Sequence, residues 1–369
     1  MPRHIRRIAI CTGGGDAPGL NAVIRSVVIS AARRGWECYG IREGYNGILF
    51  HERYPEGGVF RLTPEKVRGI GHLGGTILGT TNKGNPLQFP MKMADGTIKE
   101  VDRTAEILDF FAKQELDALV SVGGDGSLTI ANALYQKGLR VIGVPKTIDN
   151  DLDKTFTTFG FDTAVDFASN CLDRLHSTAE SHQRVMVVEV MGRYAGWIAL
   201  HAGISGGAHA VLIPEIPYDL DKVVAKILRR DSLGRMYSLV VASEGAEPVG
   251  GHREIVAPAA VGHAERLGGI GERLARQLHE LTDKDTRVVV LGHLLRGGSP
   301  TSFDRVAAMR FGTAAVRGLA EGQSGVMVAL AFPNVNYVAL EDVAGRMKGV
   351  PLDSDTLQTG RDMGICFGD

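Results

Sequence analysis

Short, mainly apolar segments recur along the chain and alternate with longer stretches that have helical spacing. The apolar segments are residues 7–11, 38–42, 118–122, 140–144, 185–190, 209–213, 238–242, 287–291 and 326–330. Apolar strands between helices are typical of a parallel sheet that is covered on both faces. The pattern therefore predicts an α/β protein with doubly wound sheets.

Two of the connecting stretches have clear helix signals. Apolar residues share one face over residues 21–34, and Gly35 ends that pattern. A second helix is predicted at about residues 162–177. Both stretches follow an apolar strand segment, as crossover helices do in a parallel sheet.

The chain contains no Ser-rich, Pro-rich or charged linker, so its domain boundary has to be inferred from strands and loops. We place the boundary near residue 150 and expect domains at 1–150 and 151–300. Residues from about 300 to 369 are expected to return to the first domain and complete it. Residues 245–267 look like the least ordered loop, because Gly and Pro break up their pattern.

Composition excludes several classes of protein. The 369 residues are 44% hydrophobic, and 41 Lys and Arg balance 42 Asp and Glu. This balance gives no overall attraction to nucleic acid or to anionic membranes. No stretch approaches the roughly 20 apolar residues of a membrane span. The four cysteines lack a C-x-x-C pair, so we expect a cytoplasmic protein without a disulfide framework or a zinc site.

The first strand runs into a glycine-rich loop, TGGGDAPGLN, which a helix follows. Glycines before a helix N-terminus offer backbone N–H groups to a phosphate at the carboxyl end of a strand. The loop has neither the G-x-x-x-x-G-K-[ST] nor the G-x-G-x-x-G pattern. Taken alone, it is equally compatible with a structural strand-to-helix turn.

Two further loops at predicted strand ends carry acidic residues. In GGDGS, Asp125 stands among glycines and is suited to hold Mg²⁺ beside substrate phosphates, although Asp is also a common turn former. In KTIDND, Asp149 and Asp151 lie beside Lys146 and Thr147, a combination that suits phosphoryl transfer. The alternative for TIDND is an Asx-rich loop that caps the next helix. Three such loops at one sheet edge favour a site.

Five motifs then occur in order between Ile8 and about Arg305: GGDAPGLN, GGDGS, TIDND, SHQRVMVVEVMGR and LGHLLRGGSP. With these motifs the chain resembles the 6-phosphofructokinases. The resemblance implies the phosphofructokinase fold, in which two Rossmann-like domains form the active site in the cleft between them. Residues 1–150 would bind the phosphoryl donor, and 151–300 would bind fructose 6-phosphate.

The resemblance also implies roles at the reacting centre. Asp149 would take the proton from the C1 hydroxyl of fructose 6-phosphate, and Thr147 would hydrogen-bond near the transferred group. Arg193 would lie at the reacting centre as well. Asp125 would help to hold Mg²⁺, and Asp151 would support that network.

The remaining binding residues follow from the same motifs. Donor-binding residues would be Gly15, Gly124, Asp125, Gly126, Ser127, Lys146 and Lys83. Substrate-binding residues would be Thr147, Asp149, Asp151, Arg184, Met191, Gly192, Arg193, Glu244, Arg287, His293 and Arg296. In the family, the residues that match Arg184 and Arg287 reach the sugar phosphate from a neighbouring subunit. We therefore expect a homo-oligomer, a dimer or a tetramer, with a substrate site shared between subunits.

Two positions bear on the phosphoryl donor. Gly126 resembles the ATP-using form, since pyrophosphate users tend to have an Asp there. Lys146 matches pyrophosphate users instead, and we give Gly126 more weight because steric and electrostatic exclusion of a nucleotide is hard to bypass. The expected reaction is Mg²⁺-dependent transfer from ATP to fructose 6-phosphate, giving fructose 1,6-bisphosphate in glycolysis.

Three alternatives to this reaction remain. The first is the same transfer from pyrophosphate, and the second is a catalytically silent subunit that binds sugar phosphate. The third is an NAD or lipid kinase, which shares the GGDG loop but leaves the MGR and GHLLRGG segments without a role.

The sequence also departs from the family pattern. After GGTILG, many relatives have an Arg that neutralises the transferring group, whereas this chain has TTNK, so Lys83 or Lys146 would supply the charge. Ile130 stands where common ATP users have a Gly at the adenine site. Arg25 matches one effector-site Arg, but the second is Ile29, so control by ADP or phosphoenolpyruvate is not expected.

Overall fold

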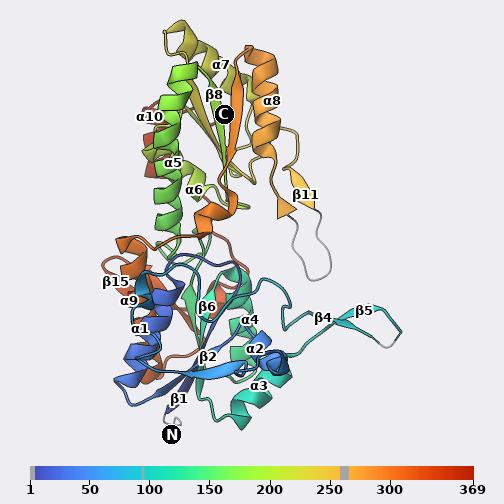
Figure 1. Cartoon of the computed structure of the whole chain (residues 1–369), viewed down its shortest axis with the longest axis vertical. Helices are drawn as coiled ribbons and strands as arrows, with labels where there is room; N and C mark the ends of the chain where they lie inside the picture. Colours follow the sequence, from blue (N-terminus) through green and yellow to red (C-terminus); the bar gives the residue numbers. More distant parts are fainter. Residues whose placement is uncertain (1–4, 94, 258–265) are drawn as a thin grey trace.

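The computed structural model describes residues 5–93, 95–257 and 266–369, which form two lobes stacked along the long axis (Figure 1). Each lobe is built on its own sheet. The larger sheet has the strand order β15-β14-β7-β6-β1-β2-β3, and the smaller has the order β13-β8-β10-β9. The predicted α/β class is confirmed.

The larger sheet combines strands from both ends of the chain. Its strands are β1 (Arg7–Thr12), β2 (Glu37–Ile41), β3 (Val59–Leu62), β6 (Ala118–Gly123), β7 (Val141–Pro145), β14 (Val326–Ala331) and β15 (Asn334–Ala339). The five central strands pair in parallel, whereas β3 and β15 add antiparallel edges. The sequence pattern predicted the five parallel strands and missed the two edges, which are partly exposed.

Helices cover both faces of this sheet. On one face, α1 (Leu20–Ala32) packs against α9 (Ser302–Ala320), and on the other lie α3 (Thr104–Lys113) and α4 (Asp125–Gln136). The contact between α1 and α9 is close, since a Cβ on Gly312 would lie 2.0 Å from Ser26 Oγ. The short α2 (Asn46–Leu49), η1 (His51–Arg53) and η2 (Ile70–His72) complete the region before Leu73.

The smaller sheet is entirely parallel. It consists of β8 (Val185–Val190), β9 (Ala210–Leu212), β10 (Ser238–Ser243) and β13 (Thr286–Val290). Its two faces are covered by α5 (Phe161–His182) with α6 (Trp197–Ser205), and by α7 (Leu220–Ser232) with α8 (Ile270–Thr282). All four strands were predicted, and so was most of α5. The segment η3 (Gly292–Arg296) follows β13.

The C-terminal part of the chain serves both lobes. After β15 and η4 (Leu340–Asp342), α10 (Asp355–Asp362) and the last residues pack on the smaller sheet, where Cys366 pairs with Ala210. Only part of the stretch from 300 to 369 therefore joins the first sheet, because Leu357 and Phe367 are buried in the core of the other lobe. The domain boundaries themselves stay a prediction.

Two antiparallel hairpins extend from the lobes. One consists of β4 (Phe89–Lys92) and β5 (Ile98–Val101) and projects sideways from the lower lobe (Figure 1). The other pairs β11 (Ile255–Ala257) with β12 (Arg266–Leu267), within the loop that we predicted to be least ordered. Residues 258–265 of that loop lie outside the described residues.

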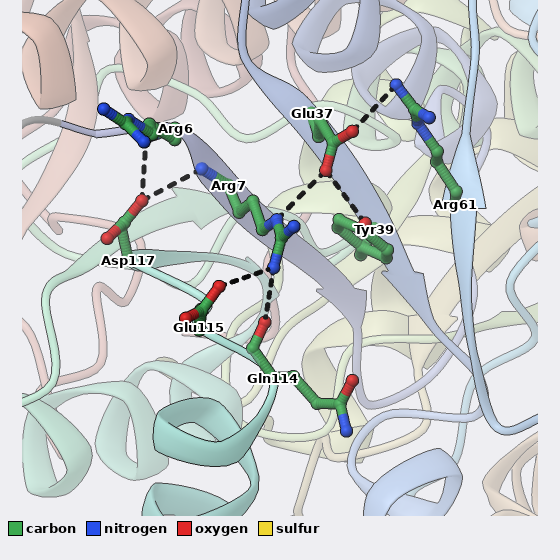
Figure 2. Close-up of polar contacts among 8 residues, drawn as sticks. All are labelled: Arg6, Arg7, Glu37, Tyr39, Arg61, Gln114, Glu115 and Asp117. Carbon is green, nitrogen blue, oxygen red and sulfur yellow. Dashed lines mark hydrogen bonds and ion pairs between the residues drawn. The ribbon is translucent and has the colours of Figure 1, made fainter.

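Ion pairs close the amino end of the larger sheet (Figure 2). Arg7 on β1 contacts Glu37 on β2 at 3.1 Å and Glu115 at 3.0 Å, and Arg61 contacts Glu37 at 3.0 Å. Asp117 accepts a hydrogen bond of 3.0 Å from the backbone N–H of Arg7. These charged groups are paired with one another, whereas the glycine loops lie at the opposite, carboxyl end of the strands. No helix among the described residues is long and apolar enough to cross a membrane.

Candidate active site

A cavity of about 340 Å³ lies at the carboxyl ends of β1, β6 and β7. It brings together all seven residues that the sequence predicted for donor binding, together with Thr147, Asp149 and Arg296. The seven are Gly15, Lys83, Gly124, Asp125, Gly126, Ser127 and Lys146. Three loops that are far apart in the sequence therefore share one site, as their strand ends predicted.

The loops suit an anion because of their backbone. Helix α4 begins at Asp125, directly after β6 and Gly124, so its N-terminal N–H groups lie at the cavity. The turns need glycine here, since a Cβ on Gly123 would lie 2.2 Å from Ser127 Oγ and one on Gly13 would lie 2.7 Å from it. The N–H groups of Gly13 and Gly14 donate to the carbonyl oxygens of Val122 and Thr81, so the N–H groups of the first turn of α4 are the ones suited to bind phosphate.

Two cations lie against the first glycine loop. Lys146 Nζ donates a hydrogen bond to the carbonyl oxygen of Gly15, and Arg296 Nη1 donates one of 3.1 Å to that of Asp16. Burial and the charge of the nearby Arg296 together lower the pKa of Lys146 to about 8. Lys146 is therefore still mainly protonated at neutral pH, and both side chains can neutralise an anionic ligand.

The TIDND loop supplies two buried carboxyl groups. The backbone N–H of Asp149 donates to Thr147 Oγ1 at 3.1 Å, and Asp149 Oδ1 is buried without a hydrogen-bond partner among the described residues. Burial raises the pKa of Asp149, although Arg296, Lys146 and Arg193 oppose that shift. Burial and the charge of Asp149 raise the pKa of Asp151 to about 6. An unpartnered buried carboxylate is costly, and its oxygen is suited to accept a hydroxyl proton from a bound substrate.

Asp125 is the candidate ligand for Mg²⁺. It lines the cavity, and its Oδ1 accepts a 2.7 Å hydrogen bond from the backbone N–H of Gly345. No cluster of three His, Cys, Asp or Glu that could hold a metal occurs in the described residues. Mg²⁺ commonly binds one or two carboxylates and completes its shell with water and substrate phosphates. The residues therefore fit an ion that arrives with a phosphate ligand.

The smaller sheet contributes the segment that follows β8. Met191, Gly192 and Arg193 come directly after this strand, and Ser243 Oγ at the end of β10 donates to the Gly192 carbonyl oxygen at 2.5 Å. Burial and the charge of Asp149 raise the pKa of Glu244 to about 7, while Arg193 opposes the shift. Glu244 and Arg193 thus act electrostatically on Asp149 across the two lobes.

Arg193 does not line the main cavity. Its guanidinium lies 5.8 Å from the centre of the Tyr194 ring and lines a second hollow with Tyr194 and His252. Met191, Gly192 and Glu244 also lie outside the residues that line the main cavity.

Arg184 and Arg287 lie at the amino end of the smaller sheet. Arg184 Nε contacts Asp285 Oδ2 at 2.5 Å, and Arg287 Nη1 pairs with Asp285 Oδ1. The six residues of β8 separate this end from Met191 by roughly 20 Å, at about 3.3 Å per residue. His293 is exposed on η3, although Arg296 of the same segment reaches the cavity. Within one chain, the predicted sugar-phosphate ligands therefore lie in different places: Arg296 lines the cavity, whereas Arg184 and Arg287 lie at the other end of the smaller sheet.

Several cavity residues were not among the predicted ligands, although Gly13, Gly14, Thr81 and Asn82 lie in stretches that the sequence analysis discussed. They are Cys11, Gly13, Gly14, Gly44, Tyr45, Thr81, Asn82, Gly84, Asn85, Pro86 and Ser121. The TTNK stretch holds the first glycine loop, since the Gly14 N–H donates to the Thr81 carbonyl oxygen at 2.9 Å and Thr80 Oγ1 donates to that of Gly14 at 2.6 Å. The only sequence signal for this wall was its position directly after GGTILG. Ile130, noted as a departure from the family, also lines the cavity.

Fold and site together define a two-lobed α/β phosphotransferase with an anion-binding cavity. The model of the family named Phosphofructokinase matches residues 7–319. The chain belongs to this family, as its motifs predicted.

Known proteins similar to this chain include users of two phosphoryl donors. An ATP-dependent 6-phosphofructokinase of Chloroflexus aurantiacus is 48% identical, over 100% of this chain and 99% of the relative. A pyrophosphate–fructose 6-phosphate 1-phosphotransferase of Amycolatopsis mediterranei is 46% identical, over 94% of this chain and 97% of the relative. The solved structure of Pichia pastoris phosphofructokinase in the T-state matches with a TM-score of 0.77 and 30% identity, over 93% of this chain and 36% of that longer chain.

Proposed function

We propose that this protein is an ATP-dependent 6-phosphofructokinase. It transfers the γ-phosphoryl group of ATP to the C1 hydroxyl of fructose 6-phosphate and forms fructose 1,6-bisphosphate, a step of glycolysis. The observation that carries the proposal is the buried, unpartnered Oδ1 of Asp149 in a cavity lined by glycine loops, Lys146 and Arg296. The 48% identity to a relative named for this activity supports it.

In this reaction Asp149 orients the C1 hydroxyl and accepts its proton. A carboxylate whose pKa is raised by burial is a better base than one in water, and the Asp149 pKa is shifted in that direction. Thr147 lies beside Asp149 and is placed to hydrogen-bond near the transferred group. Because phosphoryl transfer depends mainly on positioning and charge stabilisation, Lys146, Arg193 and Arg296 complete the centre with positive charge.

The donor phosphates bind at the glycine loops and at the N-terminus of α4. Asp125 is the residue that would hold Mg²⁺ there, and the ion would supply positive charge to the donor phosphates. Ser127 and Gly124 lie in the same wall and offer hydroxyl and N–H donors.

Open space at Gly126 supports ATP as the donor. A Cβ built at Gly126 meets no heavy atom within 4 Å, although this residue lines the cavity. Lys146 is drawn toward the Gly15 carbonyl oxygen, so its side chain leaves this space free. Tyr45 and Ile130 form apolar parts of the same wall and suit a nucleoside better than pyrophosphate would require.

The substrate site is shared between subunits of a homo-oligomer in this proposal. The separation of Arg184 and Arg287 from Met191 within one chain supports it, as does apolar surface near the edge strand β13. Val290 is 52% exposed and Leu294 is 62% exposed. The four free cysteines fit the cytoplasmic location that we also propose.

The test is a comparison of initial rates with fructose 6-phosphate and Mg²⁺, with either ATP or pyrophosphate as donor and aldolase-coupled detection. We expect a large kcat/KM advantage for ATP. A preference for pyrophosphate overturns the choice of donor, and absence of product with both donors favours the silent sugar-phosphate-binding subunit.

A Gly126→Asp variant sharpens this test. A Cβ at Gly126 meets no heavy atom within 4 Å, and the side chain and charge of an Asp there would oppose the α-phosphate and nucleoside of ATP, which pyrophosphate lacks. We expect kcat/KM for ATP to fall about 100-fold. The value for pyrophosphate should fall much less, and equal losses with both donors would show that Gly126 does not discriminate between them.

A further inference from the structure

A segment near the C-terminus crosses the loop that carries Asp149 and Asp151. We call residues 345–350 the strap. The backbone N–H of Gly345 donates to Asp125 Oδ1 at 2.7 Å, and that of Lys348 donates to the Asp151 carbonyl oxygen at 2.8 Å. Met347 and Leu152 form an antiparallel bridge between the two segments. The strap therefore binds both acidic loops of the site through the backbone.

The side chain of Lys348 adds a second set of contacts. Its Nζ donates to Asn150 Oδ1 at 3.2 Å, and to the carbonyl oxygens of Thr155 at 2.9 Å and Phe156 at 3.2 Å. An ammonium has three N–H donors, so these acceptors use all of them. Burial lowers the pKa of Lys348 to about 8, and the nearby Asp151 and Asp153 oppose that shift.

Asn150 is the residue through which Lys348 acts. It stands between the two carboxyl residues and has a left-handed backbone with φ of 51°, which a non-glycine residue rarely adopts without support. Its Oδ1 also accepts a 3.2 Å hydrogen bond from the backbone N–H of Thr158. Lys348 thus fixes the turn that sets the directions of Asp149 and Asp151.

The strap is also tied to the smaller lobe. Trp197 Nε1 donates to the Lys348 carbonyl oxygen at 3.0 Å. Glu215 Oε1 accepts from the backbone N–H of Val350 at 2.7 Å and from that of Gly196 at 3.0 Å. Gly196 and Trp197 follow Arg193 closely in the chain, so the strap links the TIDND loop with the segment that carries Arg193.

We propose that Lys348 is a positioning residue for phosphoryl transfer, which holds Asn150 so that Asp149 faces the substrate hydroxyl. The inference rests on the proposed function, and Lys348 itself contacts no reacting atom. Because a misplacement of about 1 Å can cost about 100-fold in rate, loss of this support acts on turnover more than on binding.

The kinetic test compares Lys348→Met with Arg346→Met. Arg346 is exposed on the same strap, so the control removes one positive charge from the same segment. We expect kcat of Lys348→Met to fall about 10- to 100-fold, with KM for fructose 6-phosphate changed less than about threefold. The control should stay within about twofold of the unmodified chain. An unchanged kcat in Lys348→Met, or an equal fall in both variants, overturns the proposal.

A second readout needs no turnover. Hydrogen exchange, measured by mass spectrometry on the intact chain without substrate, should be faster over residues 149–158 in Lys348→Met than in Arg346→Met. Unchanged exchange there overturns the positioning role even if the unmodified chain makes no product, so the two proposals fail separately. If Lys348→Met does not fold, Trp197→Phe removes the indole hydrogen bond to the strap and keeps an aromatic ring near Lys348 Nζ, which lies 5.5 Å from the centre of the Trp197 ring. It should show both effects in the same direction at smaller size, and a lowered melting temperature with unchanged kcat would contradict the proposal.

Discussion

The two ends of the smaller sheet differ in the environment of their acidic side chains, which raises a carboxyl pKa at one end and lowers a carboxyl pKa at the other. At the carboxyl end, Glu244 is mostly buried, and burial raises its pKa to about 7. At the amino end, Arg184 and Arg287 share one carboxylate, Asp285, whose pKa is lowered mainly by its hydrogen bond from Arg184. The carboxyl end therefore has a carboxyl group that is largely removed from water. The amino end has two guanidinium groups beside one carboxylate, which leaves a net positive charge in that group.

This difference indicates that one end of the sheet serves catalysis and the other serves binding. Desolvated carboxyl groups with raised pKa values are typical of catalytic centres, and Asp149 lies close enough to raise the pKa of Glu244. Guanidinium groups that are at least partly exposed beside one acid are suited to bind phosphate, which Arg pairs with in bidentate fashion. We expect the carboxyl end to control turnover and the amino end to control affinity for the sugar phosphate. The predictions below test that division.

The largest effect is expected at the carboxyl end, from Asp149→Asn. Loss of the general base should lower kcat by about 10²- to 10⁴-fold and leave KM for fructose 6-phosphate nearly unchanged. Steady-state kinetics measure both values. The matched control is Asp109→Asn, which removes an exposed carboxylate paired with Lys113 on α3 and should keep full activity. A residual kcat within tenfold of the unmodified chain would show that another group takes the proton.

The next largest effect is expected at the amino end, from Arg184→Ala and Arg287→Ala. Each removes a charge-assisted contact worth about 1.5–3 kcal/mol, so KM for fructose 6-phosphate should rise about 10- to 100-fold. The value of kcat should change much less. If kcat falls in either variant while KM stays the same, the expectation that the amino end controls affinity for the sugar phosphate is wrong.

Mixing subunits tests whether the two ends meet across an interface. Asp149→Asn and Arg184→Ala chains are each impaired, but a hybrid with a shared site contains one centre with both native residues. Unfolding and refolding the two together should therefore restore activity well above the sum of the separate chains. Mixing Asp149→Asn with Asp149→Asn, Arg184→Ala is the control, and no recovery in either mixture would place the whole site within one chain.

A smaller effect is expected from pH acting on Glu244. Its carboxyl is protonated below pH about 7 and then accepts fewer hydrogen bonds from sugar hydroxyls, so kcat/KM should fall as pH drops through that value.

The same carboxyl group also affects stability. Since the pKa of Glu244 in the folded chain exceeds the ordinary 4.5, its contribution to the free energy of unfolding declines as pH rises from about 4.5 to about 7. Glu244→Gln should weaken the acidic limb of the profile and stabilise the chain at pH 8 by on the order of 1 kcal/mol. Denaturant unfolding at pH 5 and pH 8 measures the second effect.

The smallest effect is expected far from both ends, in the ion pairs of the larger sheet (Figure 2). Arg61→Ala removes a contact to Glu37 between partly exposed side chains, which is worth less than about 1 kcal/mol. Melting temperature should fall slightly and kcat should not change. A loss of activity in Arg61→Ala would show that the charges at the amino end of the larger sheet influence the active site.

The sequence predicted the parallel strands and missed the antiparallel ones for a physical reason. Strands such as β6 and β8 are buried at every residue, so they appear as mainly apolar runs in the sequence. Strand β15 alternates between exposed and partly buried residues, and β5 is almost entirely exposed. Whether such a segment forms a strand depends on the strand it pairs with, and the residues of the segment alone do not reveal that partner.

The site was predictable only where its residues follow strands. Asp125, Lys146 and Asp149 stand directly after or close to apolar runs, so the shared sheet edge brings them together. Tyr45 and Lys348 reach the same region through turns and a late crossing, and neither stands in a recognisable motif. The structure was needed to find both, and to show that Arg184 lies away from the cavity in its own chain.

The order of synthesis gives the strap another consequence. A ribosome makes Asn150 long before Lys348, which lies 198 residues later and contacts it directly. A nascent chain can therefore form most of both sheets while its TIDND turn still lacks this support. If the strap has the proposed role, incomplete chains carry every catalytic side chain and still transfer phosphate slowly, so translation would yield full activity only near its end.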